Sequence, residues 1–153
     1  MKKWVAFSFI ALLFFTATTN ILAKPLDNLP LTKSSKQWKV QIAEPDNEDK
    51  QSNISHNPDL YNFYSMDVTN INGNNVELVR VEAYRDHPGS TSEYELFTMD
   101  SESVKATEPI FHHSNFPLYT KATKLKVFVT WTLKNDKSID KRKFRDQFTF
   151  ELQ

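Results

Sequence analysis

The feature that most constrains the fold is a strict alternation of apolar and polar side chains along residues 124–133. Its apolar positions are Leu125, Val127, Val129, Trp131 and Leu133. Because successive side chains of a β-strand point to opposite faces, this period of two predicts a strand with one buried face. No segment shows the period of 3.6 residues typical of an amphipathic helix, so we expect an all-β protein.

Five further segments carry strand patterns and are separated by turn signals, at residues 38–42, 64–69, 76–84, 93–99 and 144–152. Short strands with turns between them predict a small antiparallel two-layer β-sandwich, immunoglobulin-like in general architecture. A small β-barrel is the alternative. We expect this domain to occupy residues 38–153, after a flexible lead-in at residues 24–37 that is polar and contains two prolines.

Two neighbouring strand segments are joined by a polar turn with an Asn-Gly pair, which predicts a hairpin. A four-residue loop would pair Val68 with Val79 and Met66 with Val81. This register places the apolar side chains on one shared face, whereas a slip of one residue would separate them. We therefore expect these four side chains and Trp131 to lie in the core.

Residues 1–23 have the segment order of a secretory signal peptide. Two lysines precede an uncharged apolar core at residues 4–15, and a polar stretch then leads to the small residue Ala23. The apolar core is shorter than the roughly 20 residues that span a bilayer, so an uncleaved anchor is the less favoured alternative. We expect cleavage after Ala23, secretion from a Gram-positive bacterium, and no transmembrane span in the mature chain.

The chain contains no cysteine and only two glycines. Without cysteine, an exported domain has no disulfide, no thiol catalysis and no Cys-ligated zinc, so packing alone must hold it together. Gly73 and Gly89 are too few and too far apart for a dinucleotide fingerprint, a P-loop or a G-x-S-x-G nucleophile elbow. The common nucleotide enzymes and serine hydrolases are therefore excluded, and we expect no cofactor.

Charge is distributed unevenly along the chain. Residues 44–120 hold fourteen acidic and four basic residues, whereas residues 121–145 hold nine basic and two acidic residues. The basic residues toward the C-terminus predict a site for an anionic surface such as phospholipid or wall polymer. Its candidate residues are Lys134, Lys137, Lys141, Arg142, Lys143 and Arg145. The alternative is that they only keep an exposed strand soluble.

A second candidate site combines aromatic and histidine side chains in a segment that prolines interrupt. Its residues are Phe111, His112, His113, Phe116 and Tyr119, which we expect in a loop. There they would bind a partner or fold under as a lid on the core.

Metal and acid–base sites are not expected from the sequence pattern. Adjacent residues on a strand point to opposite faces, so the two neighbouring histidines could share an ion only in a loop. The acidic run at residues 44–49 lacks the EF-hand spacing and a nearby glycine, and indicates a solvated loop. No pattern brings two carboxylates together, so we assign no catalytic or metal-binding residue.

These observations favour an exported, non-catalytic binding module that acts at the bacterial cell surface or in the medium. Its expected partner is another exported protein or an anionic cell-surface polymer, and no nucleic-acid partner is expected. An inhibitor or immunity-type partner of another exported protein is the alternative function. An enzyme with a site that no motif reveals is less favoured.

The signal pattern predicts that the mature protein begins at Lys24 and is released from the cell. N-terminal sequencing of the protein recovered from culture medium would show this terminus. Recovery of only a full-length, membrane-bound chain would contradict the prediction.

Overall fold

The computed structural model describes residues 26–46, 60–73, 75–100, 110–138 and 141–152. These residues form eight strands and no helix, which confirms the all-β prediction. The strands are β1 (Leu31–Ser34), β2 (Trp38–Ala43), β3 (Tyr61–Asn70), β4 (Val76–Asp86), β5 (Glu93–Asp100), β6 (Phe111–Tyr119), β7 (Lys124–Leu133) and β8 (Lys143–Glu151).

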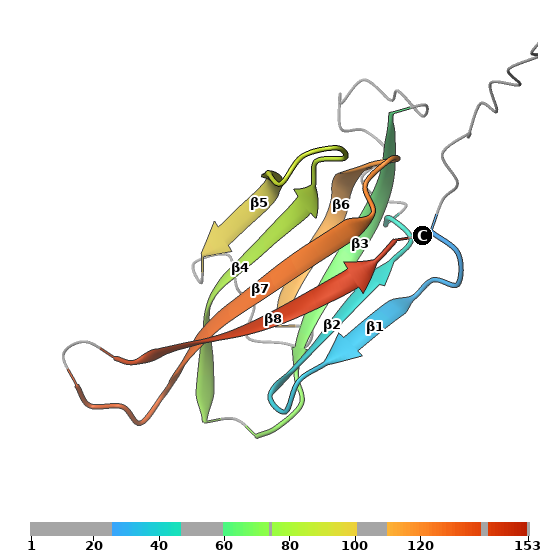
Figure 1. Ribbon diagram of the computed structural model, residues 1–153. Coiled ribbons are helices and arrows are strands. Elements are labelled where there is room, and N and C mark those ends of the chain that lie inside the picture. Colours follow the sequence, from blue (N-terminus) through green and yellow to red (C-terminus); the bar gives the residue numbers. More distant parts are fainter. Residues whose placement is uncertain (1–25, 47–59, 74, 101–109, 139–140, 153) are drawn as a thin grey trace, which may run out of the picture.

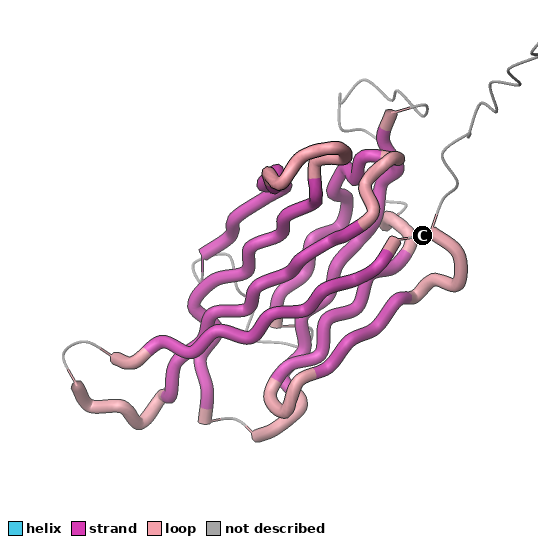
Figure 2. The backbone as a smooth tube through the Cα atoms, in the orientation of Figure 1, coloured by secondary structure: helices cyan, strands magenta, loops and turns pink. Residues whose placement is uncertain are grey.

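The strands form two antiparallel sheets that lie face to face (Figure 1). One sheet has the order β1-β2-β3-β6 and the other has the order β5-β4-β7-β8. Figure 2 shows that strands make up most of both layers and that loops are confined to their ends. Every strand pairing among the described residues stays within one sheet, so these strands do not close into a barrel. The arrangement is consistent with the expected sandwich.

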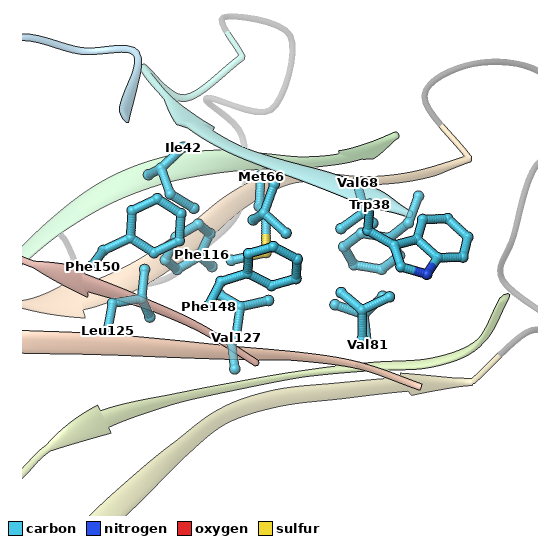
Figure 3. Packing of buried hydrophobic residues seen from close by; sticks show 14 of the residues in the cluster. Trp38, Ile42, Met66, Val68, Val81, Phe116, Leu125, Val127, Phe148 and Phe150 are labelled. Carbon is cyan, nitrogen blue, oxygen red and sulfur yellow. The ribbon is translucent and has the colours of Figure 1, made fainter. Parts of the chain in front are cut away.

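The inner faces of both sheets supply one apolar core (Figure 3). In β2 the alternating residues Trp38, Val40 and Ile42 are completely buried, while the residues between them are partly exposed. The burial pattern therefore follows the period of two expected for a strand with one inner face. The other large side chains that are essentially fully buried are Met66, Val68, Val81, Phe111, Phe116, Leu125, Val127 and Val129.

The hairpin predicted between β3 and β4 is wrong. Strand β3 pairs with β2 and β6, whereas β4 pairs with β5 and β7. The chain therefore crosses from one sheet to the other between them. Val68 and Val81 are both buried as expected, but they lie in opposite layers of the core (Figure 3). Two strands can bury their apolar faces together either as neighbours in one sheet or as members of two packed sheets. The matching of apolar faces therefore could not distinguish a hairpin from a crossover between sheets.

Strand β1 lies inside the segment expected to be a flexible lead-in. Leu31 of β1 is opposite Ile42 of β2, and Leu26, Leu29 and Leu31 pack against the core. The expectation for residues 24–37 is therefore corrected, and the domain begins before residue 38. The strand escaped prediction because its other three residues are polar and exposed, which leaves no alternation to detect.

Trp131 and Val79 are less buried than the alternation predicted. The register between β4 and β7 shifts between Leu78 and Arg80, so that Val79 has no residue opposite it in the β7 register. Val79 is only partly buried, and Trp131 is partly exposed and stacks on the exposed ring of Phe144 at a centroid distance of 4.6 Å. A bulge interrupts the regular alternation of side chains between faces, and this explains the difference.

Trp38 should be the tryptophan on which stability depends most. Trp38→Ala removes a completely buried ring and is expected to lower the free energy of unfolding by about 3–5 kcal/mol. Trp131→Ala should cause a clearly smaller loss because its ring is partly exposed, and Lys39→Ala should change stability by no more than about 0.5 kcal/mol. Denaturant unfolding of the three variants tests the ranking, and an equal loss for both tryptophan variants would contradict it.

Candidate functional site

The hairpin between β7 and β8 extends beyond the neighbouring strands of its sheet (Figure 1). Its turn is organised by Asp136. One carboxylate oxygen accepts hydrogen bonds from the backbone N–H of Ser138 at 3.0 Å and from its hydroxyl at 2.5 Å. The other oxygen accepts the backbone N–H of Arg142 at 3.1 Å. The side-chain and backbone hydrogen bonds of Ser138, and then that of Arg142, lower the pKa of Asp136 to about 2. The turn is thus held by a carboxylate that stays ionised.

Two of the six candidate basic residues are paired with glutamate side chains of β4. Lys141 Nζ lies 3.2 Å from a carboxylate oxygen of Glu77. Arg145 Nη2 lies 3.4 Å from Glu82, and its guanidinium is 3.8 Å from the centre of the Phe128 ring. These two cations are therefore engaged with the outer face of their own sheet.

The other four cations of the hairpin are exposed and make no ion pair with the described residues. They are Lys134, Lys137, Arg142 and Lys143. Within residues 134–143 there are five basic and two acidic residues, so the projecting end is positive. This subset of the predicted site is available to an external anion.

Elsewhere on the same sheet, acidic and basic side chains neutralise each other. Arg80 lies 2.6 Å from Asp100, and Lys126 pairs with Glu93. The acidic strands β4 and β5 lie in one sheet with the basic strand β7, so the charge imbalance along the sequence largely cancels in space. Exposed pairs of this kind contribute little to stability. The hairpin end is where an excess of positive charge remains.

The second candidate site is not a loop. Its residues form the edge strand β6, where Pro117 lies opposite Phe63 of β3 and is tolerated because one side of the strand needs no partner. Phe111 and Phe116 are 2% and 0% exposed and belong to the core. The expected loop is therefore wrong, and the two phenylalanine rings follow the alternative in which they fold against the core.

The two histidines of β6 have different surroundings. The ring of His113 lies 4.6 Å from that of Phe97 on the facing sheet, between the layers. His112 instead lies beside Asp67, its partner in the β3 register. Neither histidine belongs to a group of three or more metal-ligating side chains among the described residues.

His112 is held between two carboxylates. Its Nδ1 lies 2.6 Å from Asp67 Oδ1 and its Nε2 lies 2.8 Å from Asp46 Oδ2. Both ring nitrogens must donate to satisfy two carboxylates, so the geometry favours the imidazolium. Burial lowers the pKa of His112, but the hydrogen bonds and charges of Asp67 and Asp46 outweigh it, and the net pKa is raised.

This histidine fastens the segment that follows β2 across the sheet. The hydroxyl of Ser65 in β3 donates to the carbonyl of Glu44 at 2.7 Å, and the backbone N–H of Asp46 donates to the carbonyl of Ser114 in β6 at 3.1 Å. Residues 44–46 therefore run from β2 over β3 to β6, and the His112 contact closes this strap. Sequence analysis missed the two carboxylate partners because they are 66 and 45 residues away from the histidine.

The described residues form an all-β protein, and the pattern of residues 1–23 predicts its export. A family model for YozF-like secreted proteins matches residues 22–153, and the chain belongs to this family. The protein named Uncharacterized protein YozF from Bacillus subtilis (strain 168) is 31% identical over 137 residues, which cover 80% of this chain and 78% of that protein. No solved structure matches the chain.

Family membership supports secretion from a Gram-positive bacterium. The described residues include no helix with the length and apolar character needed to cross a membrane. Cleavage after Ala23 lies outside the described residues and stays a prediction.

The His112 contact should weaken as the pH rises. Because the folded-state pKa is raised above the unfolded value of about 6.5, its contribution to stability is fully present below that pH and is lost as pH rises through the folded-state pKa. The free energy of unfolding of the wild type minus that of His112→Gln should therefore decline with rising pH. Denaturant unfolding between about pH 5.5 and 9 measures this difference.

Two further variants identify the cause. Asp46→Asn removes one of the two carboxylate charges that contact the His112 ring. The pH dependence of its free energy of unfolding should therefore lie between those of the wild type and His112→Gln. His87→Gln removes an exposed loop histidine and should leave the profile parallel to that of the wild type. A parallel profile for His112→Gln would show that the two carboxylates do not stabilise its charged form.

Proposed function

We propose that this secreted protein is a non-catalytic binding module that attaches to an anionic polymer of the bacterial cell envelope through its β7–β8 hairpin. The observation that carries the proposal is the set of four exposed cations at the projecting end whose side chains make no ion pair with the described residues. In the β5-β4-β7-β8 sheet and its hairpin the other surface cations are paired with acidic residues, whereas these four are not. The paired cations are Arg80, Lys124, Lys126, Lys141 and Arg145. A ligand that pairs with these four cations must itself be anionic, because charges across an interface are complementary.

The composition of the hairpin favours a polymer over a lipid bilayer. Residues 134–143 contain a single apolar side chain, Ile139, and are otherwise charged or polar. Stable insertion into a bilayer needs buried apolar area in addition to charge. A hairpin that supplies charge alone suits a hydrated polyanion along which it can make several contacts.

A binding role agrees with the state of the ionisable groups on β6. Both ring nitrogens of His112 contact carboxylates, so the imidazolium has no free lone pair with which to accept a proton or bind a metal. Its contacts instead hold residues 44–46 against the sheet. In the immunoglobulin-like architecture that we expect, a rigid two-sheet scaffold presents binding loops at its ends.

The triple variant Lys137→Glu, Arg142→Glu and Lys143→Glu reverses the charge of the hairpin without touching the core. Each basic residue near an anionic surface contributes about 1 kcal/mol, so three losses should weaken binding to purified cell walls by roughly 100-fold or more. Wild-type binding should also fall as the salt concentration rises, since the Debye length shortens from about 10 Å at 0.1 M to about 3 Å at 1 M. Co-sedimentation of the mature protein measures both effects.

A matched control changes the same number of charges elsewhere, through Lys33→Glu, Lys39→Glu and Lys121→Glu. This variant should retain most of the binding if the hairpin is the site. Failure of the wild type to bind walls at low salt, or equal binding by the hairpin variant, would overturn the proposal. Preferential binding to anionic phospholipid vesicles over cell walls would assign the site to the membrane instead and would also overturn it.

A further inference from the structure

A buried arginine lies at the end of the domain opposite the basic hairpin. Val76 at the start of β4 is opposite Leu133, next to the hairpin, whereas Arg85 near the end of β4 is opposite Leu125. Arg85 continues the inner positions occupied by Val81 and is only 7% exposed. A charge at such a position needs a partner, because desolvation of an unpaired cation is costly.

The described residues supply no carboxylate to Arg85. Its Nη1 donates to the backbone carbonyl of Asp86 at 3.0 Å, and its buried Nε has no hydrogen-bond partner. The carboxylate of Asp86 accepts the backbone N–H groups of Thr123 at 2.8 Å and Lys124 at 3.0 Å, together with the Thr123 hydroxyl at 2.7 Å. Glu93, opposite Asp86 in the strand register, pairs with Lys126. The neighbouring acids are therefore committed to other groups.

Two aromatic rings lie close to the guanidinium of Arg85. Its central carbon lies 4.6 Å from the centre of the Tyr94 ring and 4.9 Å from that of Tyr119. The Tyr119 ring in turn lies 6.0 Å from that of Tyr61. Tyr94 is 58% exposed and Tyr61 is 38% exposed, beside the exposed side chain of Leu60. The two rings stabilise the cation electrostatically but leave its hydrogen-bonding capacity unfilled.

A shallow hollow adjoins the same end. It is lined by Tyr119, by Asn62, Tyr64 and Leu118, and by residues around the start of β7 and the end of β8. Tyr119 therefore belongs both to this hollow and to the surroundings of Arg85. Tyrosine and arginine are among the residue types enriched at the energetically dominant positions of protein interfaces.

We propose that this tyrosine–arginine end, formed by Tyr61, Arg85, Tyr94 and Tyr119, binds an acidic side chain of a peptide segment from another exported protein. A carboxylate is planar and can lie edge-on to the guanidinium, accepting its unused N–H groups. A tetrahedral phosphate would direct oxygens out of that plane and into the rings. Tyr94 forms the exposed outer wall of the site, and its ring holds the guanidinium in place. The site is separate from the hairpin and does not depend on the function proposed above.

The first test follows the Nε–H resonance of Arg85 by NMR while sodium acetate is added to the mature protein. Acetate should cause a saturable shift that sodium chloride at the same ionic strength does not cause. Inorganic phosphate should have a weaker effect than acetate. Equal effects of acetate and chloride, or a stronger effect of phosphate, would overturn the carboxylate assignment.

The second test compares the capped peptides acetyl-Tyr-Glu-Gly-amide and acetyl-Tyr-Gln-Gly-amide, which differ only by a carboxylate. The Glu peptide should bind at least about tenfold more tightly than the Gln peptide, and Tyr94→Ala should abolish most of this preference. Equal binding of both peptides, or an undiminished preference in Tyr94→Ala, would contradict the proposal.

Two variants complete this design. Arg85→Lys keeps the charge but removes the planar fork, and should lower the preference for the Glu peptide. The hairpin variant with Lys137, Arg142 and Lys143 changed to Glu should bind the peptides as the wild type does. Loss of peptide binding in the hairpin variant would show that the peptides bind the hairpin instead. Because Tyr94 is largely exposed, its variant keeps the test decisive even if Arg85→Lys does not fold.

Discussion

Contact between the apolar inner faces of two sheets holds this protein together, because the chain has no cysteine with which to cross-link the layers. Burial of apolar area is the dominant favourable term in folding, and each of the buried rings of Trp38, Phe111 and Phe116 supplies a large share per residue. This requirement keeps charged groups on the outer faces and at the ends of the strands. The features available for binding are therefore peripheral to a core that no binding event needs to disturb.

The periphery is not uniform. On the outer face of the β5-β4-β7-β8 sheet, acids and bases from neighbouring strands neutralise one another, and on the other sheet His112 is held by Asp46 and Asp67. The two ends differ from these faces. At one end, cations project from a hairpin and make no ion pair with the described residues, and at the other a buried arginine lies close to two tyrosine rings. Unsatisfied charge of this kind is what an external ligand can satisfy, so the ends are where we place the function.

The alternation of side chains predicted six of the eight strands, including β2, β4 and β7, because a half-buried strand requires a period of two. Strand β1 was missed because it has one apolar residue, and β6 was missed because Pro117 suggested a loop. Alternation also identifies which face is buried but not which strand lies alongside, so β3 and β4 were paired instead of being placed in opposite layers. Trp131 lay beyond a register shift that no sequence pattern signals.

The basic hairpin could be predicted from a local cluster of lysine and arginine, whereas the contacts of its members could not. Glu77 neutralises Lys141 across 64 residues of chain, and only the sheet order brings them together. Arg85 carried a detectable signal, since it continues the inner positions of its strand where an apolar residue belongs. Its tyrosine neighbours come from β5 and β6, and their proximity depends on the packing of the two layers.

Lysine footprinting tests the central claim, that the hairpin end contacts an anionic envelope polymer, most directly. The mature protein, free and bound to purified cell walls, is treated with an amine-reactive acetylating reagent, and the modified sites are identified by mass spectrometry. The account predicts that Lys134, Lys137 and Lys143 lose reactivity on binding, while Lys33 and Lys121 keep theirs. Equal protection of both sets, or protection of Lys33 and Lys121 alone, would contradict it.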